Sequence, residues 1–266
     1  MQTDTSWQAL LHPGEATDFF LRRPFPEFDP TITAYSPVNA LWLAELSRLV
    51  YRHDAEEDVP PPLPTRTHFL EHAGLTQKRF FHSKETGTQA MLVEFGGALP
   101  FTVLVFRGTE HNIKNYLTDL EFGELSMAGN KKAVHAGFTE ALDSVWHDMA
   151  AEIAMLNGPV FYTGHSLGAA LATLAAARHP PSAVYTFGSP RVGNQAFIAS
   201  LHNVPIYRIV DDEDIVTTVP SEARGFRHVG TELRLSSLSE TLPRSHLFGP
   251  PKPLADHAPI NYVDRL

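Results

Sequence analysis

A single serine lies between two glycines in the segment TGHSLG, residues 163–168. The apolar run before it, 159–163, predicts a buried strand, and the alanine-rich run after it, 167–178, predicts a helix. At a sharp strand-to-helix turn, glycines two positions on either side of Ser166 avoid clashes with the neighbouring backbone, and the hydroxyl projects above the edge of the sheet. The helix behind the turn directs N–H groups toward any negative oxygen formed there. These features predict that Ser166 is a reactive nucleophile and not a packed or capping serine.

A nucleophilic serine needs a base to take its proton and an acid to orient that base. In this arrangement the acid and then the histidine follow the serine along the chain. His228 lies in the alternating run RHVGTELRL, where a histidine satisfied within a sheet is the plainer interpretation, and His246 lies in a loop bounded by proline and glycine. His257 follows a proline-rich loop and begins the terminal segment HAPINYVDRL, where a short docked helix would hold it. We therefore favour His257 as the base.

The acid has several candidates at the end of the strand predicted over 204–210. These are Asp211, Asp212, Glu213 and Asp214. A solvated acidic turn is the ordinary interpretation of such a run, but Asp214 is followed by Ile215-Val216, which would return the chain to the interior. A calcium site is the alternative, although the run lacks the spaced ligands and internal glycine of a calcium loop. We favour Asp214 as the orienting acid and expect no metal.

The elements that must position these residues follow from hydrophobic periodicity and turn signals. Ser36-Pro37 has the character of a helix N-cap followed by proline at the first helical position. Strand alternating with helix predicts an α/β class protein with a mainly parallel sheet and right-handed crossovers. Helices are predicted over 37–51, 135–156 and 167–178, and strands over 79–84, 88–96, 101–106, 159–163, 183–187 and 204–210.

The length and composition fit one large core. The chain has 266 residues, 43% hydrophobic and 19% charged, so we expect a single domain over 1–266 with 1–34 as an irregular N-terminal arm. The formal net charge of −9 and the lack of a basic block argue against binding of nucleic acid.

Compartment and membrane signals are few. There is no cysteine, which excludes disulfides, thiol catalysis and cysteine metal sites. The N-terminus has no visible signal peptide, and no apolar run approaches the ~20 residues of a membrane span. Together these features favour a cytoplasmic location, with secretion by another route left open, and predict no transmembrane segment.

Several motifs resemble, in order, those of the class 3 lipases, the fungal-lipase-like branch of the α/β-hydrolases. The segment YSPVNALWLAE (35–45) also looks like the first helix of bacterial members, whereas the missing cysteines depart from secreted fungal members. The motifs are VFRGTEHNIKNYLTDL (105–120), VHAGF (134–138), TGHSLGAALATL (163–174), YTFGSPRVGN (185–194), RIVDDEDIV (208–216) and DHAPINYV (256–263).

The resemblance implies an α/β-hydrolase fold and a cofactor-free site. Position by position it makes Ser166 the nucleophile, Asp214 the acid and His257 the base. It also implies that Thr109 is the oxyanion-hole residue, with the backbone N–H of Leu167 as the second donor.

The segment after Thr109 has one apolar helical face. Ile113, Tyr116, Leu117 and Leu120 are spaced at i, i+3, i+4 and i+7. An ordinary helix packed on the core is one interpretation. By the resemblance, the alternative is a lid that covers the active site and opens at a lipid surface. The sequence leaves both open.

The function that we expect is a serine carboxylic-ester hydrolase, of triacylglycerol lipase or esterase type, acting on acylglycerols or smaller esters and in transient contact with lipid–water interfaces. A feruloyl-type or short-chain esterase is the alternative within the same chemistry. A catalytically idle member that binds lipid or a protein partner is the alternative from another class, but no triad or oxyanion residue is missing here.

Overall fold

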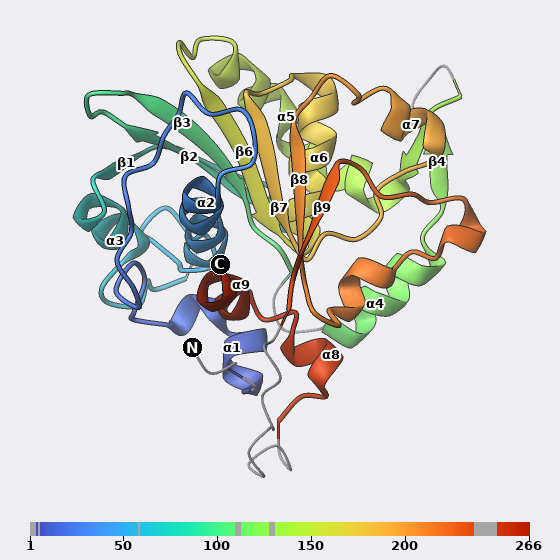
Figure 1. Cartoon of the computed structure of the whole chain (residues 1–266), viewed down its shortest axis with the longest axis horizontal. Helices are drawn as coiled ribbons and strands as arrows, with labels where there is room; N and C mark the ends of the chain where they lie inside the picture. Colours follow the sequence, from blue (N-terminus) through green and yellow to red (C-terminus); the bar gives the residue numbers. More distant parts are fainter. Residues whose placement is uncertain (1–3, 5, 58, 110–112, 128–130, 237–248) are drawn as a thin grey trace.

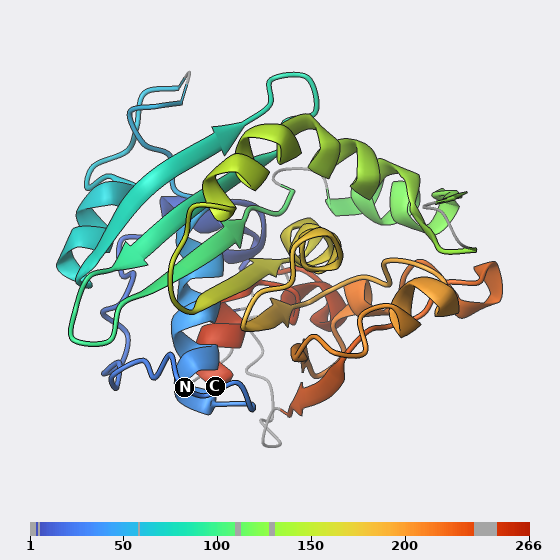
Figure 2. The ribbon, with the colours of Figure 1, turned by 90° about the horizontal axis from the view of Figure 1, so that it is seen from above.

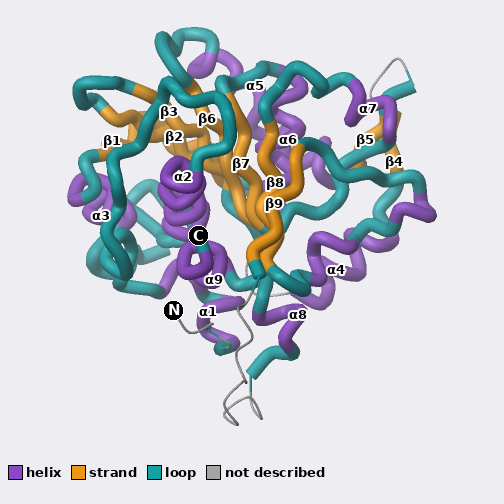
Figure 3. The backbone as a smooth tube through the Cα atoms, viewed as in Figure 1, coloured by secondary structure: helices purple, strands orange, loops and turns teal. Residues whose placement is uncertain are grey.

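The computed structural model describes residue 4 and residues 6–57, 59–109, 113–127, 131–236 and 249–266, and of residues 113, 114 and 127 the backbone alone. Through the middle of the molecule runs one sheet (Figures 1 and 3). In the described part of the chain its strand order is β1-β2-β3-β6-β7-β8-β9. The strands are β1 (Leu75–His82), β2 (Gln89–Phe95), β3 (Phe101–Phe106), β6 (Val160–His165), β7 (Ala183–Phe187), β8 (Ile206–Asp211) and β9 (Thr231–Leu235).

Most neighbours in the sheet are parallel. β3, β6, β7, β8 and β9 pair in parallel, while β1 and β2 pair antiparallel at one edge. Long crossovers with helices join the parallel strands, as such strands require. The predicted α/β class with a mainly parallel sheet is therefore confirmed.

Helices cover both faces of the sheet (Figures 1 and 2). On one face lie α2 (Pro37–Leu49) and α9 (Pro259–Arg265), and on the other lie α5 (Ala136–Ile153) and α6 (Leu167–Arg178). Successive residues of a strand point to opposite faces, so Phe161 joins the core cluster under α2 and Tyr162 joins the one under α6. Because both faces are buried, apolar residues predominate in the central strands, with a few buried polar ones such as Thr163 and Arg208.

The other elements are short. The remaining helices are α1 (Trp7–Leu11), α3 (Arg66–His72), α4 (Ile113–Phe122), α7 (Gln195–Ala199) and α8 (Lys252–Ala255). A small antiparallel pair, β4 (Leu125–Met127) and β5 (Ala133–His135), stands apart from the main sheet. Both β4 and β5 lie between α4 and α5 in the chain.

The predicted N-cap of the first long helix is confirmed. The Oγ atom of Ser36 accepts a hydrogen bond of 3.2 Å from the N–H of Asn39, and Pro37 opens α2. The helix ends at Leu49, short of the predicted residue 51. β1 begins at Leu75, before the predicted residue 79, because this edge strand carries polar side chains that alternation of apolar residues does not reveal.

The N-terminal arm packs on the body through its aromatic rings. The ring of Phe28 stacks on that of Phe101 with 4.2 Å between centroids. The arm is less irregular than expected, because it contains α1 and a 3₁₀ turn at Pro13–Glu15. Asp4 and Asn261 link it to α9 through a 2.8 Å hydrogen bond, so the two ends of the chain lie close together (Figure 1).

The loops that carry the predicted site residues meet at the carboxyl edge of the sheet, where β6 and β8 end. None of the helices in the described part of the chain has the length and apolarity that a membrane span requires.

Candidate active site

Ser166 occupies the turn between β6 and α6 with a φ of 59° and a ψ of −126°, in the left-handed half of conformational space. The turn is tight enough to exclude side chains on both flanking glycines. A Cβ added to Gly164 would lie 2.3 Å from the carbonyl carbon of Gly168, and one added to Gly168 would lie 2.2 Å from the carbonyl oxygen of Phe106. The strained backbone at Ser166 and the two glycines therefore match the predicted elbow.

Ser166, His257 and Asp214 form one chain of hydrogen bonds. The distance from His257 Nε2 to Ser166 Oγ is 2.9 Å, and that from His257 Nδ1 to Asp214 Oδ2 is 2.8 Å. A carboxylate only accepts, so Nδ1 carries the proton and Nε2 accepts from the serine hydroxyl. The side chains are almost fully buried, with Ser166 2% exposed. The structure thus brings together the three residues that the sequence singled out.

Asp214 is held by two donors. Its Oδ1 accepts from the N–H of Val216 at 2.9 Å, because the chain turns inward there as Ile215-Val216 suggested. Its Oδ2 accepts a 2.6 Å hydrogen bond from the hydroxyl of Tyr262, a residue of α9. Burial raises the pKa of Tyr262 well above its usual value, and the negative charge of Asp214 raises it further. Tyr262 stays protonated and keeps donating; the sequence analysis missed it.

His257 is held from behind by a second histidine. His165 Nε2 lies 2.8 Å from the carbonyl oxygen of His257, and the two rings are 4.5 Å apart. His165 Nδ1 lies 3.0 Å from the hydroxyl of Tyr51. Burial, and next the positive charge that His257 would carry, lower the pKa of His165 well below its usual value. His165 is therefore neutral, with Nε2–H donating to the carbonyl and Nδ1 accepting from Tyr51.

Among the other acidic residues of the run, the carboxylates of Asp211 and Asp212 pair with cations, and Glu213 makes a contact through its backbone. Asp211 pairs with Arg265, and Asp212 pairs with Lys252 at 2.5 Å. Burial raises the pKa of Asp211 to about 7, although Arg265 lowers it. Glu213 donates its N–H to Asp256 at 3.2 Å. These contacts place the run in a network of ion pairs and hydrogen bonds beside the triad.

Of the two other candidate histidines, His228 has a partner of its own outside the triad. His228 Nε2 donates to the carbonyl oxygen of Thr217 at 2.8 Å. Burial, followed by the charge of Arg208, lowers the pKa of His228 to about 3. His228 is therefore neutral, and a backbone carbonyl satisfies its donor. His246 lies outside the described residues.

The loop after β3 passes directly over the nucleophile. A Cβ added to Gly108 would lie 2.7 Å from the carbonyl oxygen of His165 and 3.2 Å from Ser166 Cβ. Thr109 follows at once and is exposed. Leu167 is the first residue of α6, where a backbone N–H has no acceptor within the helix. Leu167 therefore adjoins Ser166 along the chain, and Thr109 follows the glycine that approaches Ser166 across the turn.

The predicted apolar stripe lies on α4. Tyr116 and Leu120 are buried, Leu117 is half-buried, and the side chain of Ile113 lies outside the described part of the structure. Burial raises the pKa of Tyr116 above its usual value, and the neighbouring hydroxyl of Ser166 partly offsets this rise. The Tyr116 hydroxyl nevertheless makes no hydrogen bond of ordinary geometry with a described residue. Tyr116 of the stripe thus lies beside the nucleophile, as it would in either a core helix or a closed lid.

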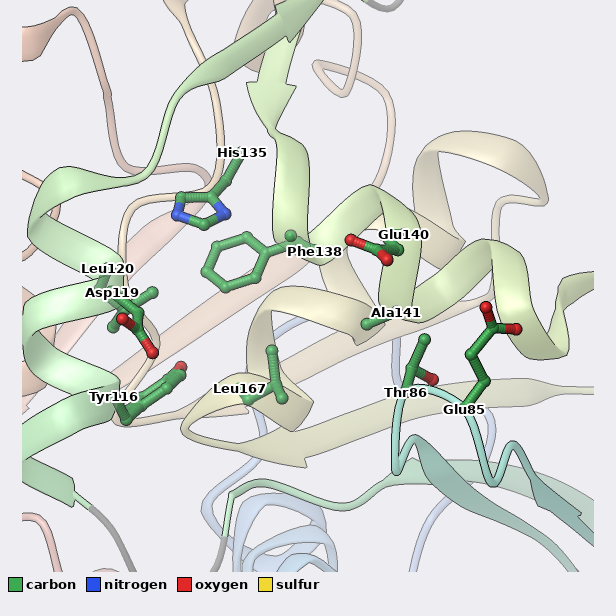
Figure 4. A pocket seen from close by; sticks show the side chains of 11 residues that line it. Glu85, Thr86, Tyr116, Asp119, Leu120, His135, Phe138, Glu140, Ala141 and Leu167 are labelled. Atoms are coloured by element: carbon green, nitrogen blue, oxygen red, sulfur yellow. The ribbon is translucent and has the colours of Figure 1, made fainter.

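Between α4 and the beginning of α5 there is a cavity of about 290 Å³, drawn in Figure 4. Leu167 and Tyr116, which neighbour the nucleophile, are among its lining residues. Phe138 and Ala141 of α5 supply apolar surface to the same cavity. A space of this kind beside Ser166 is where part of a substrate would lie.

The elbow, the order of the three side chains along the sequence and the mainly parallel sheet define an α/β-hydrolase. A model of the family Lipase (class 3) matches residues 103–223. A solved fungal lipase–inhibitor complex is 30% identical with a TM-score of 0.54, and the match covers 62% of this chain and 68% of that one. The chain belongs to the class 3 lipase family, as its motifs suggested.

Two further relatives extend the comparison. A secreted mono- and diacylglycerol lipase of Fusarium solani is 37% identical over 139 residues, which are 46% of this chain and 40% of that protein. The chain therefore spans well under half the length of this curated relative. A solved triacylglycerol lipase is 28% identical to this chain, with a TM-score of 0.61. The match covers 76% of this chain and 82% of that lipase, whose structure is described as having a serine protease triad at its catalytic centre.

The expected cytoplasmic location is wrong on this comparison, because the Fusarium relative is a secreted enzyme. The expectation rested on the absence of cysteine and of a visible signal peptide. A chain of this size buries enough surface to be stable without disulfides, so the lack of cysteine does not indicate the compartment.

Proposed function

We propose that this protein is a serine carboxylic-ester hydrolase of triacylglycerol lipase type, acting through an acyl-enzyme on Ser166. The observation that carries the proposal is the buried chain of hydrogen bonds from Ser166 through His257 to Asp214 at a strained elbow. The names of the relatives, which are lipases, support the same activity.

In the proposed reaction, Ser166 Oγ attacks the ester carbonyl while His257 Nε2 takes its proton. Asp214 keeps the imidazole in the required tautomer and stabilises its positive form. His257 then gives the proton to the leaving alcohol, and a water molecule releases the acid in a second, similar half-reaction. The N–H groups of Thr109 and Leu167, with the Thr109 hydroxyl, are the proposed donors to the oxyanion.

Acylglycerols are the proposed substrates, because the Fusarium relative is named a mono- and diacylglycerol lipase and the solved relative a triacylglycerol lipase. A feruloyl-type or short-chain esterase would use the same three residues and differ in its pocket. The catalytically idle alternative is disfavoured by the complete set of hydrogen bonds at the site. The proposed enzyme needs no cofactor or metal, binds no nucleic acid, and meets lipid–water interfaces transiently.

We further propose that residues 1–266 are one domain and that α4 is a lid. The continuous sheet supports the first proposal. The second is supported by the burial of Ser166, which is 2% exposed and lies beside Tyr116 of α4, so an ester reaches it only after something moves. Lifting α4 would expose Tyr116, Leu117 and Leu120, and a lipid surface would offset that cost.

The test is hydrolysis of p-nitrophenyl butyrate and emulsified tributyrin by purified variants. Ser166→Ala and His257→Ala should each lower kcat by several orders of magnitude, and the double variant should be hardly slower than either, because the residues act as a unit. His202→Ala, an exposed histidine of the same chain, is the control and should keep full activity. Activity that survives in Ser166→Ala, or losses that multiply in the double variant, would contradict the proposed mechanism.

A further inference from the structure

The cavity beside Ser166 has two unlike ends. Figure 4 shows Tyr116 and Asp119 of α4 on one side and Glu85 on the other, with Leu167 between them. Glu140 lies toward the Glu85 end. At that end a more open depression of about 510 Å³ shares Glu85 and Glu140 with the cavity and continues along α5. The cavity therefore extends from Tyr116 and Leu167, which neighbour the nucleophile, toward the surface past two carboxylates.

The geometry of the proposed reaction decides which part of an ester lies there. The leaving alcohol must be close to His257, because His257 Nε2 gives it a proton. His257 is not among the residues that line the cavity, whereas Leu167, on the proposed oxyanion side of Ser166, is. The acyl part of the ester, on the other side of the carbonyl carbon, is therefore the part that enters.

The described residues that line the mouth include negatively charged side chains and no lysine or arginine. Glu85 and Glu140 are exposed and make no ion pair with any described residue. Asp143, farther along the depression, is already paired with Arg178 at 2.5 Å. Among the described residues that line the cavity there is no lysine or arginine. A negative group on an acyl chain would therefore be repelled at this point.

A buried imidazole inside the cavity points to a ligand independently of the carboxylates. His135 is 7% exposed and lines the cavity, and neither ring nitrogen makes a hydrogen bond of ordinary geometry in the described structure. The backbone of Asp119 lies near the ring, but burial lowers the pKa of His135, so the ring is neutral. Buried polar groups normally have partners, and an uncharged polar atom of an entering acyl chain would supply one.

We propose, on the basis of the proposed esterase activity, that this cavity receives the acyl part of the substrate and that Glu85 and Glu140 restrict it to acyl groups without negative charge. The substrate class is then esters of neutral carboxylic acids, and acyl chains that end in a carboxylate are rejected. Neither glutamate lies on α4. Glu85 is in the turn between β1 and β2 and Glu140 is on α5, so this selection persists if α4 lifts.

Three p-nitrophenyl esters of matched shape test the proposal. They are the mono-ester of adipic acid, its neutral counterpart 6-methylheptanoate, and the cationic 5-(trimethylammonio)pentanoate, each also made two methylenes longer. The readout is the ratio of kcat/KM for each charged ester to that for the neutral one, after subtraction of the uncatalysed rate. Comparing ratios within one enzyme removes any effect of a variant on folding or on the amount of active protein.

In the unaltered enzyme the anionic ester should be the poorest substrate. The double variant Glu85→Gln, Glu140→Gln should raise the anionic-to-neutral ratio roughly fivefold to thirtyfold and lower the cationic-to-neutral ratio, since each charge at ~4 Å in water is worth ~1 kcal/mol. Added salt should shrink both effects. Asp148→Asn, an exposed carboxylate of α5 outside the cavity, is the control and should leave both ratios as they were.

Two failures are distinguishable. Ratios that stay within twofold in the double variant would overturn the proposed selection and leave the esterase proposal intact. Absence of hydrolysis of the neutral ester by the unaltered protein would instead overturn the esterase proposal, and with it the acyl site.

Discussion

At the scale of single residues, the predicted triad is held by groups that touch no reacting atom. The hydroxyl of Tyr262 bridges the site, because it donates to Asp214 Oδ2 at 2.6 Å and accepts from the N–H of Asp211 at 3.1 Å. His165 fixes the backbone of His257 in a similar way. We regard both as positioning residues, which set where the acid and the base stand.

Tyr262→Phe should lower kcat about tenfold with little change in KM, because Asp214 loses a donor and holds His257 less firmly. Removing a hydrogen bond to a charged group should also cost ~1.5–3 kcal/mol of unfolding free energy. The control is Tyr185→Phe, since the hydroxyl of Tyr185 is also hydrogen-bonded, to Ser36 and Ala34, but away from the triad. Steady-state kinetics and urea unfolding of both variants provide the check. Equal losses of kcat in the two would mean that Tyr262 acts on the fold alone.

At the scale of elements, access to Ser166 depends on α4. The helix packs through Tyr116 and Leu120. Its last turn is also held by the segment after β8, because Glu121 accepts a 3.2 Å hydrogen bond from the N–H of Ser221. A closed lid and a permanent core helix look alike in one conformation. They differ in whether the half-buried Leu117 becomes exposed when lipid is present.

The absence of native cysteine makes this exposure measurable. In Leu117→Cys, labelling by a maleimide should be slow in buffer and several-fold faster with a triglyceride emulsion, because opening of α4 at the interface exposes the side chain. Leu174→Cys, 4% exposed in α6, should stay unreactive in both, and Phe122→Cys, 69% exposed, should react quickly in both. A Leu117→Cys rate that is the same with and without emulsion would mean that the stripe is core.

Over the whole molecule, stability should fall in acid partly through His228, because burial lowers its pKa from the ordinary 6.5 to about 3 in the folded protein. The unfolded chain then binds a proton that the folded one does not, so this stabilisation is present above pH ~6.5 and is lost as pH falls toward 3. His228→Gln keeps a donor for Thr217 and cannot titrate. Urea unfolding between pH 4 and 7 should show a slope of unfolding free energy against pH that is smaller by up to ~1.4 kcal/mol per unit. Unchanged slopes would assign the acid sensitivity to other groups.

The turn that carries Ser166 between a strand and a helix could be predicted from the sequence, because local constraints act there. Gly164, Ser166 and Gly168 satisfy one tight turn, and the apolar strands before and after it are buried on both faces. The fold class and the family were therefore predictable, and the three side chains that were chosen from several candidates are hydrogen-bonded to one another. Their catalytic roles stay predictions until activity is measured.

What the sequence hid depends on contacts between distant segments. Tyr262 and Tyr51 look like ordinary apolar members of their helices, and only the fold brings them to Asp214 and His165. The fully buried Arg48 and Arg66 were equally unforeseeable, because arginine is usually exposed and each depends on acidic partners, among them Asp18 for Arg48. Periodicity reports which face of an element is buried and not which distant group it meets.

The central claim is that Ser166 is an activated nucleophile, and covalent labelling tests it most directly. The purified protein would be treated with a fluorophosphonate and the adduct located by mass spectrometry of its peptides. We expect one adduct, on Ser166, formed in step with loss of esterase activity, and no adduct on Ser166 in His257→Ala within the same time. A protein that stays unlabelled at Ser166, or that keeps its activity once Ser166 is labelled, would contradict the account.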